Sequence, residues 1–452
     1  MDNRELLGEI STPSGTIVVP DMGYLYLWSH DRPPLIPEGY PQTESIREAA
    51  NSSLDLRIDG KDAERVGELL DRQWNPRYLF DIPGHALDRA MADVAKVARE
   101  NKLSVNVVAL SERISHRKRV DLVLAHRKDG GEIQVHGMWI AVASGLPRNR
   151  TLSVYAERMP PGKHEGRWQR IYVECDPGVT TAKSVLLGQT MVDWARLMFA
   201  DVDALGHWEH EESLDGKADF VFWGRDAEQI ASTFKAHSLE EDRFGWKDLP
   251  IDQAVTLAEK ISQVRQSLDL KFATDLRPHS HHHVVLEQIR TTTTESGTID
   301  LGGVRLCGFM TSWGDGIFEV YRDTGPGGEL ARIRIELGTP QRLKLMDEVE
   351  ARCRELARFA LVSAKVLEPA ECVRYLYRET PDREEDSGWR IFAGHESDEY
   401  VNDAENVRRV PLQDMVDRDR TLEEILFSPP GTAFERNDAE SAFRKCEAPP
   451  AE

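Results

Sequence analysis

The sequence predicts a mixed α/β protein of the α+β class, in which several small modules pair antiparallel hairpin sheets with amphipathic helices. Apolar residues recur at helical spacing in some segments and at every second position in others, and turns with glycine and proline separate these segments. At 452 residues the chain is longer than a single hydrophobic core supports. With 40% hydrophobic and 30% charged residues, it can form several folded cores.

The first module is expected to span residues 1–147. Short strands are predicted where β-branched and aromatic residues follow a turn, and helices where apolar residues share one face. Its predicted elements are strands at 16–19 and 24–28, helices at 62–74 and 85–98, and a hairpin with strands at 120–125 and 133–141.

The second module is expected to span residues 148–275. Leu187, Met191, Trp194 and Met198 fall at helical spacing and predict a long helix over 181–199. Farther along the chain, a strand is predicted at 218–223, a helix with a capping box at 226–235, and another helix at 252–268.

The third module is expected to span residues 276–359. Strand 331–337 alternates apolar and charged residues, which is typical of a half-buried hairpin strand. Thr339 and Pro340 are suited to the N-cap and first position of a helix. This helix is expected to dock on the hairpin sheet.

The fourth module is expected to span residues 360–438, followed by a flexible polar tail at 439–452. Its predicted elements are strands at 361–367 and 373–377 and a helix at 422–427 capped by Thr421.

Composition limits the classes of partner. The formal charge of −21 disfavours a nucleic-acid binder and favours a basic protein partner. Five cysteines without paired spacing indicate neither a disulfide framework nor a zinc site, so a reducing cytoplasmic compartment is expected. No stretch has the length and apolarity of a signal peptide or a membrane span, so no membrane association is expected.

The histidine-rich segment PHSHHH at 278–283 is a candidate metal site, because neutral imidazoles are common metal ligands. On a strand, His279, His281 and His283 would share one face, with Asp275 close by. No other metalloenzyme signature accompanies them, and no nucleophile or phosphate-binding motif is present. We therefore expect no cofactor and no catalytic residue, and keep a metal-dependent enzyme as an alternative.

Acidic residues concentrate toward the C-terminus. Residues 365–440 contain 20 acidic and 10 basic side chains. Clusters at 382–386 and 396–399 alternate with Trp389, Phe392 and Tyr400. Aromatic anchors within an acidic rim suit electrostatically steered binding to a basic protein. A solvated face over an ordinary aromatic core is the other interpretation of this pattern.

The C-terminal segment also resembles a known family. Residues 387–403 read SGWRIFAGHESDEYVND, and residues 428–436 read SPPGTAFER. With the strand YLYRE at 375–379, they are similar to the bacterial immunity-protein family numbered thirty-three in the polymorphic-toxin classification. The resemblance covers about residues 360–438. It implies neutralisation of a toxin passed between bacteria and brings no catalytic residues.

A second likeness covers residues 311–321, TSWGDGIFEVY, with the return strand at 333–337. It is similar to a bacterial domain of unknown function usually written with SGWGDG. The glycines and Asp315 of this segment are typical of an ordinary sharp turn. The alternative is an exposed tip at which Trp313, beside Asp315, contacts a partner.

The leading hypothesis is a cytoplasmic immunity-type protein that neutralises a basic toxin by direct contact. A structural interaction protein without a toxin partner is a further alternative. Two arrangements of Trp389 remain open, in the core or as an exposed anchor. The predicted partner-binding residues are Trp389, Glu396, Asp398, Glu399, Tyr400, Asp403, Trp313 and Asp315.

Overall fold

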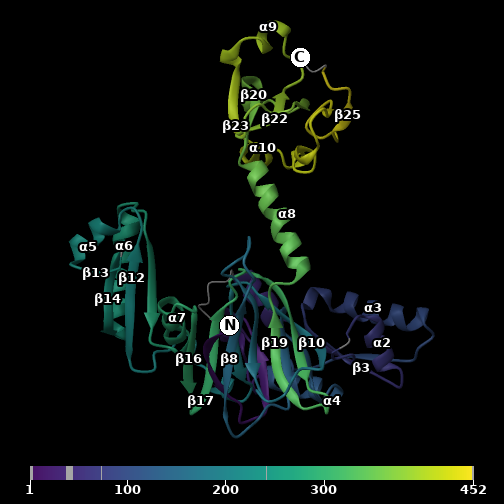
Figure 1. Ribbon diagram of the computed structural model, residues 1–452, viewed down its shortest axis with the longest axis vertical. Helices are drawn as coiled ribbons and strands as arrows, with labels where there is room; N and C mark the ends of the chain where they lie inside the picture. The colour runs from purple at the N-terminus through teal and green to yellow at the C-terminus, as the bar shows by residue number, and fades with distance from the viewer. Residues whose placement is uncertain (1–3, 37–43, 73, 241, 450–452) are drawn as a thin grey trace. The chain divides into compact units, whose positions relative to one another are not determined.

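The computed structural model describes residues 4–36, 44–72, 74–240 and 242–449 (Figure 1). The chain forms two compact units, Met1–Gly338 and Thr339–Glu452, called unit 1 and unit 2 below. Both combine helices with largely antiparallel sheets, which confirms the predicted α+β class. No helix among the described residues is long and apolar enough to cross a membrane.

Unit 1 is built on two six-stranded sheets. In spatial order, the first contains β1 (Arg4–Ser11), β8 (Thr151–Arg158), β9 (Trp168–Glu174), β19 (Leu330–Glu336), β18 (Gly316–Thr324) and β10 (Lys183–Val192). The second contains β16 (Ser296–Leu301), β17 (Val304–Met310), β11 (Arg196–Asp201), β2 (Thr16–Val19), β7 (Met138–Ser144) and β6 (Gly130–Val135).

The two sheets pack face to face, since β1 lies against β17 and β10 against β7. Fully buried apolar side chains, among them Ile17, Phe199 and Phe318, come from these strands. The second sheet is also covered by α4 (His116–His126) and α7 (His281–Thr291), which contact β6 and β16 respectively. Each helix starts at a serine, Ser115 or Ser280, whose side chain accepts a backbone N–H of the first turn.

The strand orders show that unit 1 contains the same fold twice. In the first sheet, β1, β8 and β9 correspond to β10, β18 and β19, because exchanging the two sets leaves the strand order unchanged. In the second sheet, β2, β7 and β6 correspond in the same way to β11, β17 and β16. At the junction, Arg170 pairs with Glu336 and Arg332 with Glu174, so the register is also reciprocal. We call residues 4–174 the first half and residues 183–336 the second half.

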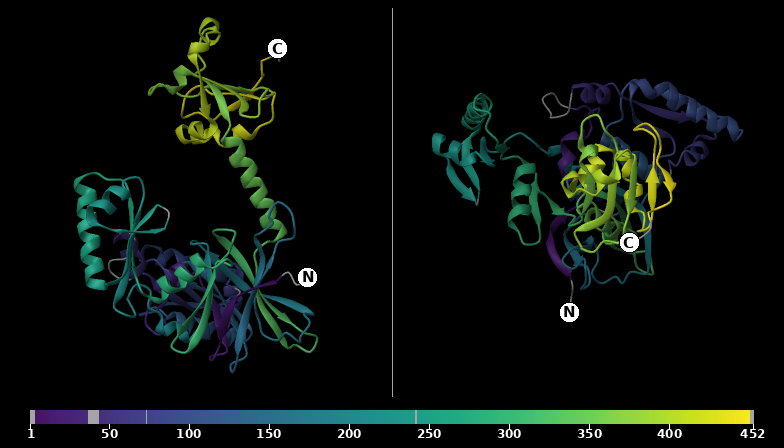
Figure 2. Two further views of the ribbon diagram at one scale, coloured as in Figure 1. Left: turned by 60° about the vertical axis from the view of Figure 1, so that its left-hand side comes forward. Right: turned by 90° about the horizontal axis from the view of Figure 1, so that it is seen from above.

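Each half carries an inserted α/β module between its second strand and its long helix. The first contains β3 (Leu54–Asp59), α2 (Ala63–Leu69), β4 (Tyr78–Ile82), α3 (Leu87–Glu100) and β5 (Asn106–Ala109). The second contains β12 (Lys217–Trp223), α5 (Ala227–Phe234), β13 (His237–Glu240), β14 (Arg243–Pro250), α6 (Ile251–Ser267) and β15 (Ala273–Pro278). Their sheet orders, β4-β3-β5 and β13-β14-β12-β15, correspond apart from the extra β13. The modules lie on opposite sides of the paired sheets (Figure 2).

The halves are joined by two buried aspartates in equivalent positions. Asp21, after β2, accepts the backbone N–H of Asp193 at 2.7 Å and of Trp194 at 2.9 Å, from the β10–β11 turn of the second half. Asp201, at the end of β11, accepts the backbone N–H of Ser14 at 3.0 Å, from the β1–β2 turn of the first half. Each half therefore fixes a turn of the other.

Unit 2 begins with α8 (Pro340–Leu356) and contains a six-stranded sheet. In spatial order the strands are β23 (Val407–Pro411), β20 (Phe359–Ser363), β22 (Asp386–Phe392), β21 (Tyr375–Arg378), β24 (Ala433–Glu435) and β25 (Arg444–Cys446). Its core joins Trp389, Leu376 and Ile391 of the sheet to Leu412 and Met415 of α10 (Leu412–Arg418).

Several predicted elements differ from the observed ones. The predicted helix at 181–199 is instead two strands, β10 and β11, which belong to different sheets. Leu187 and Val192 are buried because β10 is held in the first sheet by pairing with the distant strand β18, which local spacing does not reveal. The predicted strand at 120–125 lies in α4. The predicted strand at 24–28 is the 3-10 helix η1 (Met22–Leu27), capped by Asp21.

The chain also divides differently from the four expected modules. Strands from the three modules expected before residue 360 share both sheets of unit 1, so the expected boundaries at 147 and 275 separate no compact units. Thr339 caps α8 as predicted, and α8 belongs to unit 2, whereas the hairpin sheet on which it was expected to dock belongs to unit 1. Residues 420–427 form two 3-10 turns, with Asp419 rather than Thr421 as the cap. In the expected tail, residues 444–446 form β25.

Asp201→Ala should lower the free energy of unfolding by about 2–4 kcal/mol, because buried N–H groups of the β1–β2 turn and of Asp203 would lose their acceptor. Urea unfolding followed by circular dichroism measures this change. The control is Asp176→Ala, which removes an exposed acceptor for Gly178 and should cost about 0.5 kcal/mol or less. Equal losses in the two variants would refute the joining role of Asp201.

Candidate functional site

The outer face of the unit 2 sheet carries three aromatic side chains. Tyr375 and Tyr377 alternate with buried Leu376 along β21, and Phe392 ends the neighbouring strand β22. The pleat therefore directs Leu376 into the core and the tyrosines away from it. The ring centroids of Tyr377 and Phe392 are 5.9 Å apart with the planes inclined by 10°, and Tyr375 lies 5.9 Å from Tyr377.

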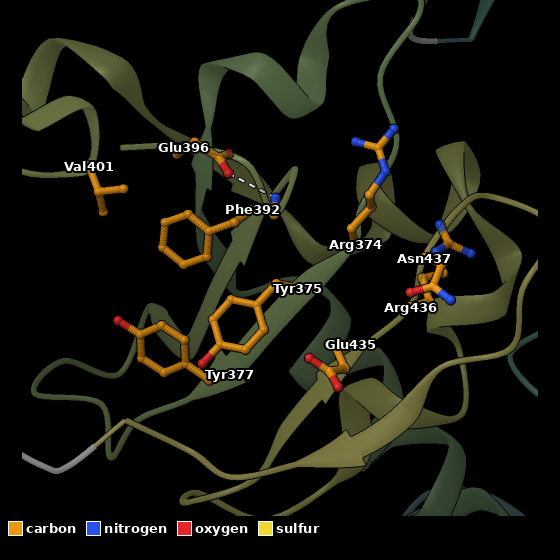
Figure 3. A pocket seen from close by; sticks show the side chains of 10 residues that line it. Arg374, Tyr375, Tyr377, Phe392, Glu396, Val401, Glu435, Arg436 and Asn437 are labelled. Atoms are coloured by element: carbon orange, nitrogen blue, oxygen red, sulfur yellow. Dashed lines mark hydrogen bonds between the residues drawn. The ribbon is translucent and has the colours of Figure 1, made fainter. Parts of the chain in front are cut away.

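These rings form the floor of a solvent-open cavity of about 570 Å³ (Figure 3). The cavity is called the aromatic cavity below. Its lining residues are Arg374, Tyr375, Tyr377, Phe392, Gly394, Glu396, Val401, Glu435, Arg436 and Asn437.

Both arginines of the lining are already paired with acids. Arg374 forms an ion pair with Glu371 at 2.9 Å, and the buried guanidinium of Arg436 pairs with Asp419. Glu435, which stands opposite Tyr375 on β24, is exposed. The cavity thus combines stacked aromatic rings with charges that are largely balanced within the unit.

Glu396 shapes one wall of the cavity. Its carboxylate accepts the backbone N–H groups of Ala393 and Gly394, each at 2.8 Å, and of His395 at 3.1 Å. Burial opposes ionisation, but hydrogen bonds to the carboxylate outweigh it and hold the pKa of Glu396 below its usual value. The residue is therefore an anionic clamp on the loop that follows β22.

The other predicted acids lie on the segment after this clamp, residues 396–405, called the acidic loop below. Asp398 and Glu399 occupy the first turn of α9 (Asp398–Val401) and are exposed. Asp403 is exposed and caps the following 3-10 turn. Tyr400 is half-buried, with the Lys365 ammonium 4.6 Å from its ring centroid. Glu396 and Val401 belong to both the loop and the cavity lining.

The predicted tryptophans do not reach the surface. Trp389 is fully buried, and its indole N–H donates to the carbonyl oxygen of Leu426 at 2.9 Å. Trp313 is 3% exposed and donates to the carbonyl oxygen of Trp168 at 2.7 Å, so the alternative of an exposed tip at Trp313 is wrong. Asp315 is exposed and accepts the backbone N–H of Ala195 at 2.9 Å.

The histidines do not share a strand face. His281, His282 and His283 form the first turn of α7, and only His279 lies beside the end of β15. His279 contacts Asp215 and Asp219 at 2.9 and 3.2 Å. Within the described residues, no group of three or more His, Cys, Asp or Glu side chains is arranged to hold a metal ion.

His282 instead packs against His210, with ring centroids 4.0 Å apart. Burial lowers the pKa of His282 to about 2 and that of His210 to about 3. Both rings are thus neutral parts of the protein interior.

Of the three rings, Phe392 was anticipated from the sequence, whereas Tyr375 and Tyr377 were missed although their signal was present. In YLY at 375–377 an apolar residue lies between two amphipathic aromatic residues, and strand alternation places the two tyrosines on the face opposite Leu376. Trp194 was missed as an exposed residue because it had been assigned to a helix.

The comparisons with known proteins concern unit 2. Residues 360–447 match the family model described as the Immunity protein Imm33 domain. This match agrees with the resemblance noted for the C-terminal segment and extends it through β25. No curated protein and no solved structure matches the chain.

The contributions of His210 and His282 to the free energy of unfolding should fall as the pH decreases from 7 to 5. Because the folded-state pKa values of His210 and His282 lie below the ordinary value of 6.5, the unfolded chain binds protons that the folded chain does not. Each histidine contributes a slope of about 1.4 kcal/mol per pH unit below its unfolded pKa. Urea unfolding across this range should show a shallower slope for His282→Leu, whereas the exposed-site control His207→Leu should retain the original slope.

Proposed function

We propose that the protein neutralises a protein toxin by direct binding, with the aromatic cavity and the acidic loop of unit 2 as the contact surface. The observation that carries this proposal is that the immunity-domain match falls on a unit with its own core and a solvent-open aromatic cavity. A domain of this family implies a toxin as partner. The cavity supplies a physical means of holding one.

Aromatic side chains supply much of the binding energy at protein interfaces, because they bury large areas and have few rotatable bonds. Tyr377 and Phe392 stack, Tyr375 packs beside them with its ring tilted, and all three stand on a strand framework, so they are ordered before a partner arrives. Binding to such a surface loses little side-chain entropy. We therefore assign the anchoring role to the cavity floor.

The acidic loop is assigned a steering role. Asp398, Glu399 and Asp403 are exposed within a few residues of one another, and the whole chain has a formal charge of −21. Such a surface accelerates encounter with a basic partner and repels acidic ones. The proposed toxin surface is accordingly basic.

Neutralisation by contact requires no catalysis and no cofactor, and we place it in the cytoplasm, where a toxin that enters the cell would be met. The alternative of a metal-dependent enzyme is not favoured. His281 uses its Nδ1 to accept the backbone N–H of Glu209 at 2.9 Å, and His282 is stacked on His210, so both rings have structural contacts.

The test is co-expression of the full chain with toxin domains encoded in the neighbouring reading frames, followed by measurement of the dissociation constant by calorimetry. The wild-type chain should restore growth and bind the toxin. Tyr377→Ser should weaken binding by about tenfold or more, as expected for an anchor residue. The control Tyr78→Ser removes another half-buried tyrosine, from unit 1, and should leave the affinity unchanged. Growth inhibition by every neighbouring toxin despite the wild-type chain would contradict the proposal.

Reversing the charge of the acidic loop should separate steering from folding. The double variant Asp398→Lys, Glu399→Lys should lower the association rate by about tenfold at low salt and flatten its salt dependence, because the steering field is lost. Its stability should change by about 0.5 kcal/mol or less, since both side chains are exposed. The control Glu384→Lys, Glu385→Lys reverses two exposed acids before β22. Stopped-flow fluorescence would disprove the steering role if both double variants slowed association equally.

A further inference from the structure

The turn between β10 and β11 presents an exposed tryptophan. The side chain of Trp194 is 55% exposed, and no other tryptophan among the described residues is exposed to this degree. A single exposed apolar side chain is by itself ordinary on a protein surface, so the significance of Trp194 depends on the turn that carries it. The tip lies in unit 1, outside the immunity-domain match.

The turn that carries Trp194 is held firmly in place. Asp21 accepts the backbone N–H groups of Asp193 and Trp194, and Asp315 accepts that of Ala195 at 2.9 Å. The carbonyl oxygen of Ala195 accepts the backbone N–H of Thr311 at 2.9 Å. The indole is therefore carried by a turn fixed at both ends, which is the ordering expected of a binding anchor.

The first half of unit 1 contains the equivalent turn without the tryptophan. Its residues are Ser14 and Gly15, which correspond to Trp194 and Ala195. Gly15 has φ +75° and Ala195 φ +54°, so both turns use the left-handed conformation. Asp201 holds the Ser14 N–H just as Asp21 holds that of Trp194. The turn can thus form with a small polar residue, and its folding does not require the indole.

The second turn is also the more strained of the two. A left-handed conformation suits glycine, whereas for alanine it costs about 1 kcal/mol. Strain in an exposed turn together with an exposed indole indicates a role other than stability. The indole rests against Gly23, where an added Cβ would approach the Trp194 ring to 2.6 Å.

The charges around the ring are mainly acidic. Asp193 lies on the turn that carries Trp194, Asp315 lies on the turn between β17 and β18, and both are exposed. The Tyr24 hydroxyl donates to Asp193 at 2.8 Å. Arg196 is half-buried, with its guanidinium 5.5 Å from the indole centroid. An apolar tip with acidic neighbours is complementary to a basic surface that contains an apolar cleft.

We propose that Trp194, with Tyr24 and the carboxylates of Asp193 and Asp315, forms a second contact surface for the basic toxin. This inference rests on the proposed function and adds unit 1 to the binding site. The indole inserts into an apolar cleft of the toxin, and the two acids contact basic residues around that cleft.

The experiment compares full-length wild type with Trp194→Ser, which installs the residue that the first half uses at the equivalent position. Calorimetric titration uses a toxin domain encoded in the neighbouring reading frames. Trp194→Ser should raise the dissociation constant by about tenfold or more, as for other central aromatic anchors. Its melting temperature should match that of wild type. The control Leu214→Ser removes a side chain of similar exposure, 51%, from the second inserted module and should leave binding unchanged.

The outcomes separate the two proposals. If Tyr377→Ser weakens toxin binding and Trp194→Ser does not, the second surface is refuted and the proposed function stands. If wild type binds none of the toxins, both proposals fail. Sedimentation velocity of the toxin-free chain provides another check. A wild-type dimer that Trp194→Ser converts to a monomer, with toxin affinity unchanged, would assign the tip to a second copy of the chain and overturn the inference.

Discussion

Two buried carboxylates, Asp21 and Asp201, set the arrangement on which the rest of unit 1 depends. Each ends a central strand of the second sheet and accepts backbone N–H groups from a turn in the other half. Burial raises the pKa of Asp21 to about 6, while hydrogen bonds to its carboxylate oppose the rise. A buried carboxylate persists only where such donors compensate for lost water. The reciprocal donors therefore tie the halves together as one folded unit.

The same reciprocity recurs in the packing of the long helices. His116 in α4 accepts the backbone N–H of Ser29 and packs 5.6 Å from Trp28, measured between ring centroids. His281 in α7 accepts the N–H of Glu209 and packs 5.8 Å from Trp208. These contacts account for part of the histidine-rich segment. His281 is equivalent to the structural histidine of α4 in the first half. The histidine-rich sequence suggested metal binding, but the contacts of His281 are those of helix packing.

Local signals predicted the elements that depend on local structure. Thr339 and Pro340 begin α8 as expected, and α6 lies where its apolar spacing placed it. Helix α5 lies where a capping box was predicted, although the Asp226 side chain makes no capping hydrogen bond. Strands β10 and β11 were missed because Leu187, Met191 and Met198 fit a helical face, whereas β10 pairs with β18 more than a hundred residues later. Such pairing is decided by the tertiary fold. The duplication of unit 1 likewise lies in strand order rather than in local sequence spacing.

The candidate surface could be predicted only in part. The resemblance placed the acids Asp398, Glu399 and Asp403 in an immunity-type segment, and they are exposed. The resemblance could not tell whether Trp389 or Phe392 faces outward. The two residues are an odd number of positions apart on one strand, so one must face the core and the other must face outward, but the sequence does not say which. Trp389 occupies the core and Phe392 the cavity floor.

In both units the proposed binding side chains are separate from the folding core. In unit 2 the pleat of β21 and β22 assigns alternate residues to the two tasks, so Tyr377 can change while Leu376 continues to hold the core. In unit 1 the proposed binding side chain lies on a turn, and Asp21 fixes the backbone of this turn whatever side chain the turn carries. A duplicated frame favours this second arrangement. One copy of the turn keeps Ser14 and Gly15 with little strain, and the other is free to carry Trp194 at the cost of a strained Ala195.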